Sequence, residues 1–179
     1  MAGNAESLLK QGNQARREHR FGDSKSLCAE AVEQCRSSND QPLLARALTR
    51  LGGSERDLDE IAASLAHYQE AVAIYRTLDD PQNLAHSVRH VGDILRESNR
   101  LSEAATSYAE ALEIYRRHPD TDTLDLANTL RGFALLKAAI GEADAARSLW
   151  QEAGSLYAQV GVAAGVAESQ RQITLLASH

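Results

Sequence analysis

The sequence feature that most constrains the fold is a pattern that returns about every forty residues. Its clearest copy occupies residues 84–117, where apolar residues recur at steps of three and four: Leu84, Val88, Val91 and Leu95. Asn99 and Arg100 interrupt this periodicity, and a second set follows at similar spacing: Ala104, Tyr108, Ala111, Leu112 and Tyr115. The segment therefore predicts two amphipathic helices that fold back antiparallel across a short turn. Such a hairpin cannot bury both of its faces alone and needs neighbours of the same kind.

The rest of the chain supplies those neighbours. A shift of forty residues toward the N-terminus aligns four residues with Gly92, Tyr108, Ala111 and Tyr115: Gly52, Tyr68, Ala71 and Tyr75. A second shift of forty aligns Gly12, Phe21, Ala31 and Cys35 with Gly92, Leu101, Ala111 and Tyr115. Toward the C-terminus the shift is forty-two, with matches at Ala127, Phe133, Trp150, Ala153 and Tyr157. The two extra residues fall in the polar linker 118–124, where an insertion costs little. The sequence thus predicts four helical hairpins, at about 2–40, 41–80, 81–120 and 121–160, and a capping helix at 162–177.

These repeats resemble the tetratricopeptide repeat family, in which a small residue of the first helix meets a small and an aromatic residue of the second. Gly92, Ala104, Tyr108 and Ala111 occupy those places. The usual period of the family is about 34 residues, and forty is similar to the longer subclass of kinesin light chains and bacterial peptide-sensing regulators. HEAT-type repeats have a comparable period, but the Ala-x3-Tyr-x2-Ala spacing favours the tetratricopeptide family. The resemblance implies an all-α, right-handed superhelical solenoid of antiparallel helix pairs that forms one domain over residues 1–179.

Composition limits the classes of function. No run of eighteen apolar residues occurs and the chain begins without a cleavable apolar segment, so we expect a soluble, cytoplasmic protein that does not itself bind a membrane. Every aromatic residue falls on a repeat position, which leaves none to stack a base or a cofactor ring. The formal net charge of −6 also disfavours nucleic acid as a partner. We expect no cofactor.

Two adjacent glycines mark the place where the repeat pattern is weakest. Gly52 and Gly53 together cost about 1–2 kcal/mol of helix stability, and Glu55 stands where the third repeat has Leu95. We therefore expect the helix to bend or fray there and to form a flexible joint.

The two cysteines, Cys28 and Cys35, lie seven residues apart in one predicted helix. That spacing separates them by about 10.5 Å along the axis, whereas a disulfide requires Cα atoms within about 7 Å. They occupy the positions of Tyr108 and Tyr115, so we interpret them as small apolar core residues rather than as a disulfide or metal site.

The charges are unevenly distributed over the repeats. In tetratricopeptide arrays the first helix of each hairpin lines the concave surface. The corresponding basic residues here are Lys10, Arg16, Arg17, Arg46, Arg50, Arg56, Arg89, Arg96, Arg131 and Arg171, and the acidic ones are Glu6, Asp57, Asp93, Glu97 and Glu168. Ten against five leaves +5 on that surface, so the remainder of the chain carries −11.

This segregation predicts an adaptor that binds an acidic or extended segment of another protein in an arginine-rich groove, because the guanidinium fork matches carboxylate and phosphate groups. The predicted peptide-binding residues are Asn13, Arg46, Arg50, Arg56, His86, Arg89, His90, Arg96, Arg131 and Arg171. The alternative is that these arginines pair with neighbouring carboxylates and form a solvated, self-neutralised face.

More specific chemistry receives little support from the sequence. The carboxylate-clamp subset of the family pairs lysine, asparagine and arginine; Asn13 fits one such place, but Leu9 stands where the lysine is expected. A stripe on one helical face contains His86, His90, Asp93 and Glu97, which is a weak metal-binding pattern because arginines flank it. No nucleophile or phosphate-binding loop accompanies these residues, so we do not expect an enzyme.

The closing helix offers an alternative function. It lacks a partner helix in the predicted array, and Leu175 and Leu176 near its end would leave an apolar patch. The chain would then be a structural assembly module that forms homodimers through its C-terminal helix and has no dedicated groove ligand.

Overall fold

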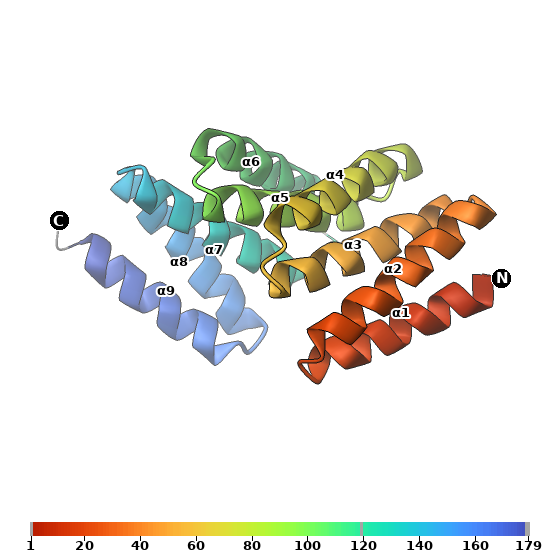
Figure 1. The fold of residues 1–179 in the computed structure, drawn as a ribbon. Helices are drawn as coiled ribbons and strands as arrows, with labels where there is room; N and C mark the ends of the chain where they lie inside the picture. Colours follow the sequence, from red (N-terminus) through yellow and green to blue (C-terminus); the bar gives the residue numbers. More distant parts are fainter. Residues whose placement is uncertain (1, 119, 178–179) are drawn as a thin grey trace. The chain divides into compact units, whose positions relative to one another are not determined.

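A computed structural model describes residues 2–118 and 120–177 of the chain. The described residues form nine α-helices and no strand (Figure 1). The helices are α1 (Ala2–Arg17), α2 (Phe21–Ser38), α3 (Gln41–Asp57), α4 (Ile61–Leu78), α5 (Pro81–Glu97), α6 (Leu101–Arg117), α7 (Thr123–Ala139), α8 (Ala143–Gln159) and α9 (Ala163–Leu176). Each predicted repeat holds one pair of helices and α9 is the capping helix, so the predicted fold class is confirmed. Within the described part of the chain, no helix is both long and apolar enough to cross a membrane.

The chain divides into two compact units, Met1–Ser87 and Val88–His179, with the division inside α5. In the first unit α1 packs on α2, α2 on α3, and α3 on α4. In the second, α6 packs on α7, α7 on α8, and α8 on α9. The single continuous solenoid over residues 1–179 remains a prediction.

The turns between helices share one backbone device. A residue with positive φ follows α1, α3 and α5 at His19, Asp59 and Asn99, and α2 and α4 are followed in the same way by Asn39 and Asp79. Asparagine and aspartate tolerate this left-handed conformation better than most residues. The turns after α7 and α8 use Gly141 and Gly161 instead. The chain reversals therefore repeat with the same period as the core residues. Residue 119 of the polar linker lies outside the described residues.

The tyrosine and tryptophan repeat positions lie in the core of each unit, whereas Phe21 and Phe133 are half-buried. The tyrosine and tryptophan side chains are all buried: Tyr68, Tyr75, Tyr108, Tyr115, Trp150 and Tyr157. The two cysteines that replace tyrosines in the first repeat are buried and free, which confirms their interpretation as core residues. A Cβ added to Gly12 would lie 2.9 Å from Cys28 Sγ, so the smaller side chain still packs closely against the first helix.

The prediction of a flexible joint at Gly52 and Gly53 is wrong. Helix α3 continues through both glycines to Asp57, and both are buried. A Cβ added to Gly52 would lie 2.9 Å from the Tyr68 ring, so the glycine leaves room for this ring of α4 against α3. Packing against the tyrosine therefore stabilises a segment whose intrinsic helix propensity is low.

The unusual Glu55 has a partner on the next helix. Glu55 is only 3% exposed, and its Oε2 lies 2.7 Å from Nδ1 of His67 on α4. A buried carboxylate needs such a hydrogen bond to offset the loss of hydration. The second repeat therefore replaces the apolar contact of Leu95 with a polar pair that still joins the two helices of the hairpin.

Candidate functional site

A basic pocket lies between the first helices of the first two repeats. Its volume is about 340 Å³, and it is lined by Asn13, Arg16, Arg17 and Arg50. The three residues from α1 share one helical face because they stand at steps of three and four, and Arg50 comes from α3, which packs on α1. We call this set the α1–α3 pocket.

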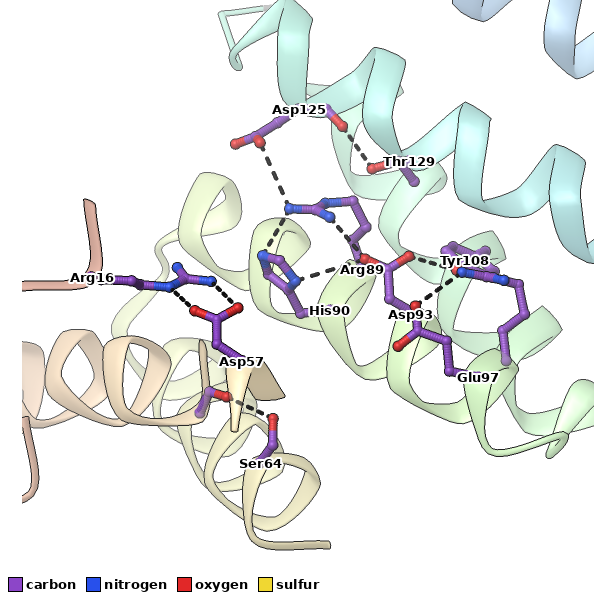
Figure 2. A network of polar contacts seen from close by, with 12 residues as sticks. Arg16, Asp57, Ser64, Arg89, His90, Asp93, Glu97, Tyr108, Asp125 and Thr129 are labelled. Carbon is purple, nitrogen blue, oxygen red and sulfur yellow. Dashed lines mark hydrogen bonds and ion pairs between the residues drawn. The ribbon is translucent and has the colours of Figure 1, made fainter. Parts of the chain in front are cut away.

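Within this pocket Arg16 is fixed by a carboxylate. Its Nε and Nη2 lie 2.5 and 3.2 Å from the two carboxylate oxygens of Asp57, a bidentate pair shown in Figure 2. The hydrogen bond to Asp57 raises the pKa of Arg16, although burial opposes the shift. A Cβ added to Gly53 would lie 3.1 Å from Arg16 Nη1. The second glycine of the pair therefore leaves room for this guanidinium against α3.

A second polar cluster lies in the other unit and is largely buried. Arg89 and Asp93, each 8% exposed, form an ion pair on α5 with Arg89 Nη1 2.9 Å from Asp93 Oδ2. Tyr108 on α6 donates its hydroxyl proton to Asp93 Oδ1 at 2.7 Å. Arg89 Nη2 also lies 2.8 Å from His90 Nε2 and 4.0 Å from Asp125 on α7 (Figure 2). We call these five residues the Arg89 network.

The Arg89 network is built to hold helices together. Burial, followed by the nearby Asp93 charge, raises the pKa of Tyr108 far above its ordinary value, so the phenol stays protonated and keeps donating. Asp93 thus accepts from both a guanidinium and a phenol, which balances the cost of burying its charge. The contacts connect α5 with α6 and α7. Arg89 presents little of its guanidinium to a partner in this arrangement.

Other predicted site arginines of the second unit also have internal partners. Arg131 on α7 makes a bidentate pair with Glu168 on α9, with distances of 2.7 and 2.8 Å. Arg96 contacts Glu97 at 3.2 Å and the Tyr108 hydroxyl at 3.3 Å. These pairs fit the alternative of a self-neutralised face for this part of the surface.

The predicted peptide-binding residues therefore divide between the units. The first unit holds Asn13, Arg46, Arg50, Arg56 and His86, and the second holds Arg89, His90, Arg96, Arg131 and Arg171. The structure brings Asn13 together with Arg50, and Arg89 together with His90. Arg46 is exposed and lies 3.9 Å from Glu6, while Arg171 is exposed on α9. That the residues of both units line one groove remains a prediction.

Two pocket residues, Arg16 and Arg17, belong to the basic residues expected on the concave surface but not to the predicted peptide-binding residues. The signal that links them to Asn13 is the helical spacing of three and four, which was present in the sequence. As for metals, the described residues contain no cluster of three or more histidine, cysteine, aspartate or glutamate side chains suited to hold an ion.

Comparison with known proteins identifies the family. The sequence pattern of the Tetratricopeptide repeat family matches residues 4–77 and, in a second overlapping register, residues 43–117. Together these matches span more than half of the chain. The chain belongs to the tetratricopeptide repeat family. No curated protein matches it by sequence.

Solved structures of similar fold extend over nearly the whole tetratricopeptide repeat chain. BtubC (BKLC) from P. vanneervenii has a TM-score of 0.74 at 16% identity, covering 99% of this chain and 83% of its own. Aspartyl phosphate phosphatase F from Bacillus subtilis has a TM-score of 0.87 at 14% identity, covering 98% of this chain and 45% of its own. A Rap protein complexed with competence and sporulation factor has a TM-score of 0.81 at 14% identity, covering 97% and 48%. The chain thus spans about half the length of the last two proteins, and at these identities the likeness shows the fold alone.

Proposed function

We propose that this tetratricopeptide repeat chain is a non-enzymatic, protein-binding adaptor that captures an acidic, extended segment of a partner. Repeats of this family are typically interaction scaffolds, and the similar Rap protein is complexed with competence and sporulation factor. The observation that carries the proposal is the α1–α3 pocket. There Arg17 and Arg50 are exposed and make no ion pair within the described part of the chain, next to the amide of Asn13. Guanidinium groups without an internal carboxylate are available to a carboxylate of another protein.

Arg17 and Arg50 are better targets for charge reversal than Arg89. Arg89 would be a poor choice for charge reversal, because replacing it would leave the buried Asp93 carboxylate without its cation and destabilise the fold. Arg17→Glu with Arg50→Glu reverses two exposed charges instead. Arg116→Glu with Arg117→Glu, at the exposed end of α6, is the control with the same change in charge; these two arginines pair with Glu152 and Glu113 on the surface.

The test is affinity capture from the native source with each variant as bait, followed by measurement of the captured partner's affinity at increasing salt. We expect the partner to be lost with the pocket variant, retained with the control, and bound more weakly as salt rises. Partner binding that is indifferent to both the pocket charges and the salt concentration would refute the proposed mode of binding.

A second candidate is assembly through the end of the chain. Leu175 on α9 is 58% exposed and borders a surface hollow of about 520 Å³ with Ala167, Gln170, Arg171 and Thr174. Exposed apolar surface of this kind favours self-association. Light scattering coupled to size-exclusion chromatography tests it: a homodimer that dissociates on Leu175→Glu supports this candidate, and a monomer at all concentrations excludes it.

A further inference from the structure

The α1–α3 pocket combines one fixed guanidinium with two available ones. The bidentate pair with Asp57 uses Nε and Nη2 of Arg16, and Nη1 takes no part in it. Because the pair immobilises the side chain, its remaining donors are presented in one orientation without a further loss of side-chain entropy on binding.

The other two guanidinium groups differ from most arginines of the same unit. Arg20 and Arg36 each contact carboxylates on the protein surface, whereas Arg17 and Arg50 have no such partner among the described residues. Asn13 adds an amide that can both donate and accept. With three guanidinium groups and the single carboxylate of Asp57, the pocket keeps a formal charge of +2.

This charge and donor set fit a dianion better than a single carboxylate. A carboxylate carries one negative charge and two oxygens, and would neutralise half of the surplus. A phosphorylated side chain carries about −1.5 to −2 charges at neutral pH and three acceptor oxygens. Guanidinium forks bind phosphate oxygens in pairs, and such charge-assisted hydrogen bonds are the strong ones. The pocket volume of about 340 Å³ also lies within the usual range for ligand pockets, about 300–1,000 Å³.

We propose that the α1–α3 pocket binds the phosphoryl group of a phosphorylated serine or threonine in the extended segment of the partner. This proposal rests on the proposed adaptor function and specifies its ligand. Arg17 and Arg50 supply the mobile clamps, Arg16 the fixed donor, and Asn13 the neutral contact. Phosphorylation of the partner would then switch its capture on.

The test uses the full chain and a short glycine-flanked peptide, blocked at both ends, whose central residue is phosphoserine, glutamate or serine. Calorimetric titration at about 0.1 M salt compares the three, and the serine peptide with a free C-terminal carboxylate is a fourth ligand. We expect the phosphoserine peptide to bind about tenfold or more tightly than the glutamate peptide, because one further charge-assisted hydrogen bond is worth about that factor. Inorganic phosphate should compete.

Variants assign the binding to the pocket. Arg17→Glu with Arg50→Glu should abolish phosphopeptide binding, while Arg116→Glu with Arg117→Glu should leave it unchanged. Arg50→Lys keeps the charge but loses the planar fork, so it should weaken the phosphopeptide more than the glutamate peptide. Far-ultraviolet circular dichroism of each variant verifies that the helices are retained.

Three outcomes would overturn the proposal: equal affinity for phosphoserine and glutamate peptides, tighter binding of the free C-terminal carboxylate, or phosphopeptide binding that survives reversal of Arg17 and Arg50. The first two would leave the adaptor function standing with a carboxylate as its ligand. Partner capture that depends neither on the pocket charges nor on salt would refute the adaptor mode itself. Failure of the phosphoryl ligand and failure of the adaptor mode are therefore distinguishable.

Discussion

Gly132→Ala is a sensitive test of how the second unit is packed. A Cβ added to Gly132 on α7 would lie 2.7 Å from Tyr108 Cε1, 2.8 Å from its hydroxyl oxygen and 2.9 Å from Cζ. The ring cannot move aside easily, since it is buried and its hydroxyl donates to Asp93 at 2.7 Å. It also packs against Gly92 on α5, where an added Cβ would lie 3.2 Å from the ring. A single methyl group therefore forces either α7 or the Tyr108 ring to shift.

The magnitude follows from three contributions. Overpacking of a core costs about 1–3 kcal/mol, and weakening the hydrogen bond from Tyr108 to the buried Asp93 carboxylate costs about 1.5–3 kcal/mol. The higher helix propensity of alanine than of glycine opposes these losses and stabilises the helix by about 1 kcal/mol. We expect the free energy of unfolding to fall by about 3 kcal/mol, which is a large fraction of the stability of a typical domain.

The assay is urea denaturation followed by fluorescence of Trp150, the one tryptophan of the chain, which is buried in the second unit. Gly22→Ala on α2 is the matched control, because an added Cβ there meets nothing within 4 Å. The free energy of unfolding of Gly22→Ala, followed by far-ultraviolet circular dichroism, should rise by about 0.5 kcal/mol.

A second background separates the clash from other effects. Tyr108→Leu removes all three side-chain atoms closest to Gly132, so in this background Gly132→Ala should become neutral or stabilising. A Gly132→Ala variant as stable as the native chain would refute this clash, and so would a loss of stability that is unchanged when Tyr108 is replaced.

Two further predictions concern the first unit. His67→Ala leaves the buried Glu55 carboxylate without its hydrogen-bond partner, so the free energy of unfolding measured in urea should fall by about 2 kcal/mol. Glu55→Leu restores the residue type of Leu95, so its free energy of unfolding should stay within about 1 kcal/mol of the native value. A larger loss for Glu55→Leu than for His67→Ala would contradict the role given to this pair. Burial raises the pKa of the thiols of Cys28 and Cys35 above the unfolded value of about 8.5. As the pH rises past that value, the unfolded chain therefore loses these protons first and the free energy of unfolding falls. The fall of the free energy of unfolding with pH should be smaller in the Cys28→Ala, Cys35→Ala variant. A native chain whose stability does not change between about pH 8 and 10 would contradict this prediction.

The repeat pattern made most of the fold predictable. Three helix pairs carry small and aromatic residues at the same positions, and the first keeps the spacing with Cys28 and Cys35 at the aromatic positions, so four weak signals support one another. The positions of Tyr68, Tyr108 and Trp150 in the core followed directly. The prediction failed at Gly52 and Gly53 because helix propensity is a local quantity, and the close approach of Tyr68 that stabilises the segment comes from the next helix.

The candidate site was predictable only in part. The enrichment of arginine on the first helices is visible in the sequence, but pairing decides which of these groups a partner can reach. Arg16 is paired with Asp57, 41 residues away, and Arg131 with Glu168, 37 residues away. Arg50 has no comparable partner among the described residues.

The sequence by itself determined the architecture of this protein, because a repeated amphipathic pattern leaves each hairpin one way to bury its apolar face. Only the tertiary structure decided where charge is available and where a side chain must be absent. Those properties depend on distances of a few ångströms between atoms of different repeats, as at Gly132 against Tyr108 and at Arg16 against Gly53. A one-dimensional pattern fixes which helices meet but not the separation of the atoms on them.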